Sequence, residues 1–203
     1  IYCEGTFNFA KFNNFSANYA HTDYLLFLND DIGIKNPNWI EPLLEQAQRK
    51  EVGAVGAKLL FLNKEIQHAG MIIGLFGTAG NAFSGLNQWT NKANNLANVI
   101  RNCSAVTGAC LMIRKKLFLE IGGFDEHFPV SFNDVDLCLR LRKKDYLITY
   151  TPFSVLYHIE SATRKHNDFV NMPYLQKKWG NTFKEDPYYN INLTKNKTDY
   201  SLP

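Results

Sequence analysis

Short apolar runs, each followed by a polar or turn-forming segment, recur along most of the chain. Their lengths and their Val, Ile and Leu content are typical of buried strands. The predicted strands cover residues 24–28, 52–62, 71–75, 104–113, 147–150 and 155–157. Apolar positions with helical spacing predict helices at 39–49, 115–121, 135–144 and near 170–179.

Strands that alternate with helices predict an α/β fold with a mostly parallel sheet. In such sheets ligands bind beyond the carboxyl ends of the strands. Acidic residues that directly follow a predicted strand are therefore the first candidates for a functional site.

Two segments lack a clear period. Residues 76–98 are rich in Gly, Asn and Ala, and we predict a long loop with one helical turn, a kind of segment that is usually functional or mobile. From residue 166 the chain is polar, and we expect one helix followed by an extended tail. We therefore divide one domain into residues 1–165 and a terminal part, 166–203.

Composition narrows the class of protein. The chain has 203 residues, 45% of them hydrophobic, which suffices for the core of one domain. A net charge of +3 with both signs mixed does not indicate nucleic acid binding. The chain has no CxxC pair, so the sequence does not predict a zinc cluster. No apolar run reaches the 18 residues that a membrane-spanning helix needs. We expect reduced thiols and a cytoplasmic protein, peripheral at most to the inner face of a membrane.

The first chemical candidate is the run LLFLNDDI, in which a predicted strand delivers Asn29, Asp30 and Asp31 to the sheet edge. Adjacent carboxylates repel each other unless a cation is near, and oxygen ligands suit Mg²⁺ or Mn²⁺. A turn in which Asp caps the next segment explains the same residues equally well.

The second candidate is FNDVD, where Asp134 and Asp136 lie at the start of a predicted helix. Acids in a first helical turn interact favourably with the helix dipole, and Asn133 is a good N-cap, so a structural role is open. The functional alternative is a general base that deprotonates a hydroxyl group.

The third candidate is YHIESATR, where His158 follows a short strand and Arg164 could meet a phosphate. A single His is more often structural than a ligand, and a solvated Arg is common. His68, in IQHAG, is equally ambiguous.

Taken in order, the motifs resemble those of the family-2 glycosyltransferases of GT-A fold, above all the bacterial branch that builds O-antigens and other cell-surface polysaccharides. The likeness extends from about Phe7 to Thr194. The motifs that carry it are LLFLNDD, VGAVGAKL, IQHAG, SAVTGACLMIRKKLF, GGFDE, FNDVDLCLRLRKKDY and YTPFSVLYHIESATR.

The resemblance implies a Rossmann-like sheet and a divalent metal, Mn²⁺ or Mg²⁺. NDD matches the family's metal motif, with Asp31 as first ligand, Asp30 as second and Asn29 in place of the leading acid. His158 matches a late His that reaches the metal in similar enzymes.

The resemblance also implies a catalytic base at Asp134, with Asp136 as the next choice. The residues that would line the sugar and acceptor pocket are Asn29, Thr107, Gly108, Gly123, Phe124, Asp125 and Arg164. The implied reaction is inverting transfer of a sugar from a nucleoside-diphosphate sugar to a saccharide or lipid-linked saccharide acceptor.

One family feature is absent. Members begin with a strand that opens the nucleotide-binding half, often similar to SIIIPTYN, and this chain has no such run. We therefore expect the sheet to be incomplete at its N-terminal side and its exposed edge to allow self-association. A fragment or binding module without activity is the alternative function. A phosphatase with an Asp nucleophile is disfavoured, because NDDIG lacks the required pattern.

Overall fold

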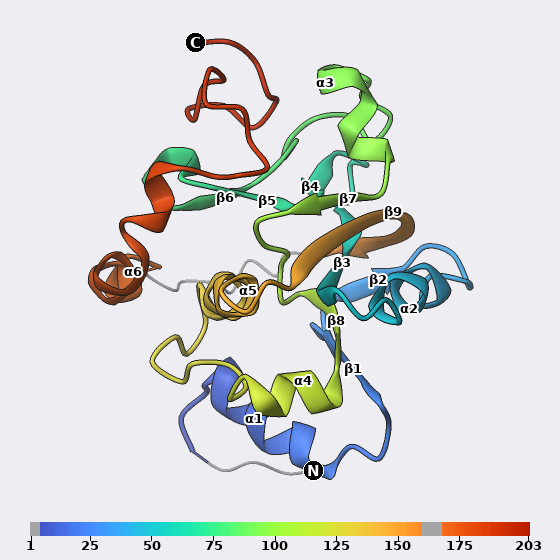
Figure 1. Cartoon of the computed structure of the whole chain (residues 1–203). Coiled ribbons are helices and arrows are strands. Elements are labelled where there is room, and N and C mark those ends of the chain that lie inside the picture. Colours follow the sequence, from blue (N-terminus) through green and yellow to red (C-terminus); the bar gives the residue numbers. More distant parts are fainter. Residues whose placement is uncertain (1–4, 160–167) are drawn as a thin grey trace.

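The computed structural model describes residues 5–159 and 168–203, and the fold is built on one central sheet (Figure 1). The strand order is β1-β8-β3-β9-β2, with β4 paired to β3 and β7 paired to β9. These strands are β1 (Tyr24–Leu28), β2 (Ile32–Ile34), β3 (Val52–Leu60), β4 (Ile66–His68), β7 (Arg101–Cys103), β8 (Cys110–Arg114) and β9 (Leu147–His158). A separate hairpin pairs β5 (Met71–Ile73) with β6 (Ala79–Asn81).

The helices flank this sheet (Figure 1). They are α1 (Phe9–Tyr19), α2 (Glu41–Ala47), α3 (Lys92–Asn95), α4 (Lys115–Glu120), α5 (Asn133–Arg142) and α6 (Met172–Trp179), with short 3₁₀ turns between some of them. One apolar cluster lies between the sheet and α2, and a larger one unites the sheet with α1, α4, α5 and α6. Strand β3 is buried along its whole length because apolar side chains cover it on both faces.

The central sheet with flanking helices confirms the predicted architecture, but the predicted pairing direction is wrong. Among the described strands only β3 and β9 pair in parallel, and the pairs β1–β8, β3–β8, β2–β9, β3–β4 and β7–β9 are antiparallel. The physical reason is that an apolar run signals burial on both faces, whatever the direction of its neighbours.

The predicted elements otherwise recur with shifted ends. Residues 147–150 and 155–157 belong to one strand, β9, which passes a register shift opposite Ala57 and Lys58. Sequence patterns missed α1, whose Asn and Phe residues have low helix propensity. This helix is started instead by Asn8, whose side chain accepts a hydrogen bond of 2.9 Å from the Lys11 N–H.

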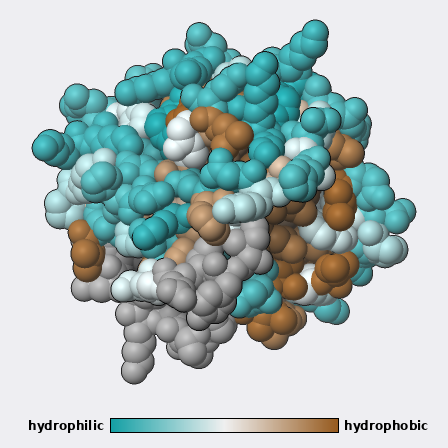
Figure 2. Space-filling model, turned by 90° about the horizontal axis from the view of Figure 1, so that it is seen from below, coloured by the Kyte–Doolittle hydropathy of each residue, from teal (hydrophilic) through white to brown (hydrophobic). Residues whose placement is uncertain are grey.

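The outer strands of the sheet are β1 and β2, and within the described chain neither pairs on its outer side. The end of the molecule that carries α1 and α4 shows apolar patches among polar surface (Figure 2). Its exposed apolar side chains include Phe7, Phe15 and Leu119. Self-association through the edge stays a prediction.

Buried charge joins α5 to α6. The Asp136 side chain has no exposed surface, and its Oδ2 accepts a hydrogen bond from Arg140 Nε at 2.7 Å. Its Oδ1 accepts from Trp179 Nε1 at 2.8 Å and lies 2.7 Å from Lys178 Nζ. Oδ1 thus holds α6 against α5, and Oδ2 is used within α5.

Replacing Asp136 with Ala should lower the free energy of unfolding by about 3 kcal/mol or more, because Arg140 and Lys178 lose a buried partner. Urea denaturation followed by circular dichroism measures the change. Glu120→Gln is the control, since its exposed pair with Lys116 at 3.9 Å should contribute less than about 1 kcal/mol. Equal effects of the two substitutions would contradict the proposed role of Asp136 in stability.

Candidate functional site

The predicted metal motif forms the turn between β1 and β2. The Asn29 N–H donates to the Ala109 carbonyl at 3.0 Å, and the Asp31 carbonyl accepts from the Ile159 N–H at 2.9 Å. Asp31 is half-buried, whereas Asp30 is exposed. The backbone therefore fixes Asp31 beside the end of β9 and leaves Asp30 toward solvent.

His158, the last residue of β9, meets this turn because it pairs with Ile32 of β2. Its Nε2 lies 3.0 Å from Asp31 Oδ1 and 3.3 Å from the amide nitrogen of Asn29. Its Nδ1 lies 2.5 Å from Gln67 Oε1. The structure thus brings together three predicted residues and adds Gln67, which the sequence reasoning did not select.

The contact with Gln67 sets the tautomer of His158. An amide oxygen only accepts hydrogen bonds, so the Nδ1 nitrogen of His158 carries the proton. In the neutral ring, Nε2 then presents a lone pair toward Asp31 Oδ1, a buried oxygen that has no hydrogen-bond donor in the described chain. A cation between the Nε2 nitrogen of His158 and the Oδ1 oxygen of Asp31 would relieve the repulsion of these two acceptors.

These atoms fit a divalent cation of the Mn²⁺ or Mg²⁺ type. A carboxylate oxygen and an imidazole nitrogen suit such ions, which complete their shell with water and substrate phosphates. Over residues 5–159 and 168–203, no three His, Cys, Asp or Glu side chains converge as a metal site. Asp31 and His158 would hold the ion as a partial shell, open to a ligand.

Asp134 lies in the first turn of α5, half-buried. Its Oδ2 accepts from the Gly108 N–H and its Oδ1 from the Val135 N–H, both at 2.8 Å. Burial raises the pKa of this carboxyl above its ordinary value, against the lowering effect of these hydrogen bonds. A raised pKa makes a carboxylate a stronger proton acceptor at neutral pH.

A short backbone segment connects the two acidic sites. Gly108 binds Asp134, and the next residue, Ala109, binds the backbone of Asn29. Thr107 contributes a further hydrogen bond to Asp134. The segment formed by residues 107–109 therefore places the predicted metal motif and the predicted base at the same end of the sheet.

The second acid of the FNDVD motif has a different environment. Asp136 is enclosed by Arg140, Lys178 and Trp179, which favours a structural role over proton transfer. Asp134 is the acid of this motif that keeps partial access to solvent.

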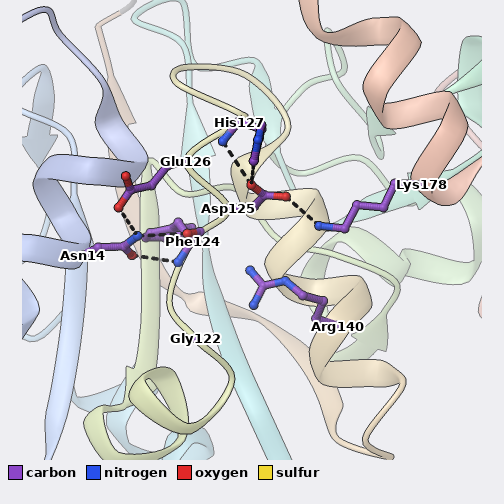
Figure 3. A pocket seen from close by; sticks show the side chains of 8 residues that line it. All are labelled: Asn14, Gly122, Phe124, Asp125, Glu126, His127, Arg140 and Lys178. Atoms are coloured by element: carbon purple, nitrogen blue, oxygen red, sulfur yellow. Dashed lines mark hydrogen bonds and ion pairs between the residues drawn. The ribbon is translucent and has the colours of Figure 1, made fainter.

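The GGFDE segment lines an open depression of about 420 Å³ (Figure 3). Phe124 is buried against Phe9, Phe27 and Phe118, so it belongs to the core. Gly123 has φ +67°, and a Cβ there would lie 2.4 Å from the Asn14 side-chain oxygen.

Asp125 stands between His127 and Lys178 in this depression (Figure 3). Its Oδ2 lies 2.7 Å from Lys178 Nζ and accepts from the Tyr174 hydroxyl at 2.9 Å. Burial opposes its ionisation, but hydrogen bonds from Lys178 and His127 outweigh burial and hold the pKa of Asp125 well below its usual range. Its carboxylate therefore also fastens α6.

The remaining histidine candidate is structural. His68 is buried, accepts from the Gly70 N–H at 3.2 Å and contacts Asn81 Oδ1 at 2.8 Å. Burial lowers the pKa of His68 to about 4, so the ring is neutral at pH 7. In IQHAG it is thus Gln67, one residue earlier, that reaches the candidate metal site. Arg164 lies outside the described residues.

Comparison with known proteins finds relatives along most of the chain. A model of "Glycosyltransferase like family 2" matches residues 2–175. The O-antigen biosynthesis protein RfbC of Myxococcus xanthus is 39% identical over 97% of this chain, and the chain spans 16% of its length. The N-acetylglucosaminyl-diphospho-decaprenol L-rhamnosyltransferase of Mycobacterium tuberculosis H37Rv is 30% identical over 70% of the chain and 48% of its own length.

Solved structures agree on the fold. GalNAc-T7 with UDP, GalNAc and Mn²⁺ superposes with a TM-score of 0.64 at 13% identity, over 90% of this chain and 36% of that one. The mannosyltransferase PcManGT of Pyrobaculum calidifontis, with GDP-Man and Mn²⁺, superposes with a TM-score of 0.53 at 12% identity, over 90% of this chain and 45% of that one. The predicted GT-A fold is confirmed. The match over residues 2–175 places this chain in glycosyltransferase family 2.

Proposed function

We propose that the protein transfers a sugar from a nucleoside-diphosphate sugar to a saccharide acceptor, with inversion at the anomeric carbon, in the synthesis of a cell-surface polysaccharide. The observation that carries the proposal is the pair of acidic sites, Asp31 with His158 and Asp134, linked by residues 107–109. The names of the O-antigen protein and the rhamnosyltransferase among its relatives support this class of reaction.

Asp31 and His158 would hold a divalent cation, Mn²⁺ or Mg²⁺, and Asp30 is close enough in sequence to assist through water. When bound, the cation neutralises charge that develops on the leaving diphosphate. The Asn29 amide nitrogen lies 3.3 Å from His158 Nε2 and would give up this contact when the cation takes the Nε2 lone pair. The Mn²⁺ in the two solved glycosyltransferases is consistent with this choice of ion.

Asp134 would accept the proton of the acceptor hydroxyl as this oxygen attacks the anomeric carbon opposite the leaving group. The hydrogen bonds from Gly108 and Val135 hold the carboxylate in one orientation. Thr107 and Gly108 would then border the acceptor. Phe124 and Asp125 would form part of the wall of the depression without binding the sugar through their side chains, since the Phe124 ring is buried and the Asp125 carboxylate is already paired. Gly123 would set the course of the backbone between Gly122 and Phe124.

The relative from Mycobacterium tuberculosis is named for an acceptor sugar joined through a diphosphate to a polyprenol. We extend that acceptor class, a lipid-linked saccharide, to the protein to which this chain belongs. The depression beside Asp125 and the exposed turn at Asp30 are both open to solvent, as access for a large acceptor requires.

Substituting Asp134 with Asn should lower the rate of sugar transfer at least about a hundredfold, because the amide cannot accept the hydroxyl proton. Transfer is measured from UDP-, GDP- and dTDP-sugars, first to find the donor used and then to compare variants. The acid limb of the wild-type pH profile should lie above the ordinary range for Asp, because burial raises the pKa of Asp134.

Asp145→Asn is the matched control for this substitution, since Asp145 is exposed just beyond the end of α5 and should not affect transfer. Nearly normal transfer by the Asp134 variant would eliminate Asp134 as the base. Nucleotide binding without transfer by the wild type would favour a binding module instead.

Gln67→Leu should weaken Mn²⁺ binding about 10- to 100-fold, because His158 loses the acceptor that fixes its tautomer. Electron paramagnetic resonance of free Mn²⁺ measures the affinity, with and without UDP. Gln46→Leu is the control, as it removes a similarly buried amide that contacts Arg49 in another part of the fold. Unchanged Mn²⁺ affinity in the Gln67 variant would show that this contact does not support the site.

A further inference from the structure

Trp89 is an exposed aromatic side chain on the loop between β6 and β7. Its exposed fraction is 74%, whereas Trp39 and Trp179 are only 6% and 3% exposed. The loop turns sharply before it, because the Trp89 N–H donates to the Asn87 side-chain oxygen at 2.9 Å. An exposed indole offers a large, flat apolar face to a ligand.

A buried lysine supports this loop from below. Lys58 lies in β3 with 3% of its surface exposed. Its Nζ donates to the Gln88 carbonyl at 2.6 Å and to Asn98 Oδ1 at 2.7 Å, and lies 5.9 Å from the centre of the Trp89 ring. Burial and the charge of Lys35 lower the pKa of Lys58 to about 8, so it is mostly charged at pH 7. The loop is therefore held in place by a costly buried charge.

A second ammonium group stands beside the same ring. Lys35 Nζ donates to Gln88 Oε1 at 2.9 Å and lies 6.0 Å from the centre of Trp89 and 5.9 Å from that of Tyr157. An ammonium has three donors, so Lys35 retains donors for a ligand. Within residues 5–159 and 168–203, neither Lys35 nor Lys58 forms an ion pair with a carboxylate.

Lys35 and the loop that carries Trp89 both lie next to strands that lead to the candidate active site. Lys35 directly follows β2, and Asp31 directly precedes it, so at most about 13 Å separates their Cα atoms along the strand. On the other side, the loop is bridged to β4 through Asn87 and Glu65, two residues before the Gln67 that contacts His158. Two rigid strands thus connect the exposed ring to the candidate metal site.

We propose that Trp89 and Lys35 form an outer acceptor subsite that binds an anionic saccharide. The apolar face of a sugar ring would stack on the indole, and a phosphate or carboxylate on that saccharide would pair with the Lys35 ammonium. Lys58 would add positive potential from beneath without touching the ligand. The proposal rests on the proposed glycosyl transfer and names the chemistry of its acceptor.

Binding is tested by nuclear magnetic resonance of the indole N–H groups, where the three tryptophans give separate signals. Glucose 1-phosphate and glucuronic acid are the probes, and glucose and inorganic phosphate are their neutral and sugar-free counterparts. We expect the two anionic sugars to shift the Trp89 signal selectively. Trp89→Leu should weaken binding about tenfold and Lys35→Gln at least about threefold.

Two control variants sharpen the test. Trp89→Phe keeps an aromatic face and should retain most of the affinity. Lys92→Gln removes an exposed charge of the same loop, one that pairs with Asp199, and should leave binding unchanged. If glucose 1-phosphate is bound through its phosphate alone, inorganic phosphate binds equally well and the subsite is refuted.

Other outcomes also decide the question. Unchanged sugar affinity in Trp89→Leu would overturn the proposal, as would loss of binding to anionic phospholipid vesicles in that variant without any sugar effect. Asp134→Asn should still bind both probes. Full sugar binding at Trp89 combined with normal transfer by Asp134→Asn would reject the proposed base and leave the subsite standing.

Discussion

The candidate active site depends on one short backbone segment, residues 107–109, which enters β8. On one side Ala109 accepts the N–H of Asn29, and on the other the Gly108 N–H binds Asp134. Backbone hydrogen bonds of this kind are directional and leave little freedom to the groups that they join. They fix a turn that carries Asp31 and a helix start that carries Asp134, two acidic sites that are far apart in sequence. Catalysis of the proposed kind requires such fixed placement, because a displacement of about 1 Å already slows a reaction substantially.

The two acids of FNDVD show how burial separates the roles of similar residues. Asp136 has Arg140, Lys178 and Trp179 around it, so its charge is neutralised and its lone pairs are used. Asp134 has only N–H and hydroxyl donors, and burial raises its pKa. The fold therefore opposes ionisation of Asp134. The protonated carboxyl contributes to the stability of the fold at low pH, and this contribution is lost as the pH rises through the pKa that Asp134 has in the folded protein. A carboxylate whose pKa is raised in this way is suited to take up a proton.

Much of this arrangement was predictable from the sequence. The apolar run before Asn29 predicted a strand at 24–28, and β1 has these same bounds. The direction of strand pairing was not, because burial on both faces looks alike for either direction. Single-residue roles were also hidden. His68 and Gln67 are neighbours in one strand, β4. Both β4 and β9 pair with the last residues of β3, and only this arrangement tells which of the two side chains meets His158.

The outer loop follows the same logic at the other end of β2. Asp31 directly precedes the three-residue strand β2 and Lys35 directly follows it, so the pairing of β2 with β9 fixes the backbone between them. Gly33 lies at the middle, where a Cβ would contact that of Tyr157 at 3.5 Å, so even the smallest side chain would fill the space beside β9. The backbone of β2 therefore fixes the spacing between the proposed cation site and the start of the Lys35 side chain. Such a fixed spacing would select acceptors by length as well as by charge, since in the proposed reaction a saccharide bound at Trp89 must also reach the reacting centre.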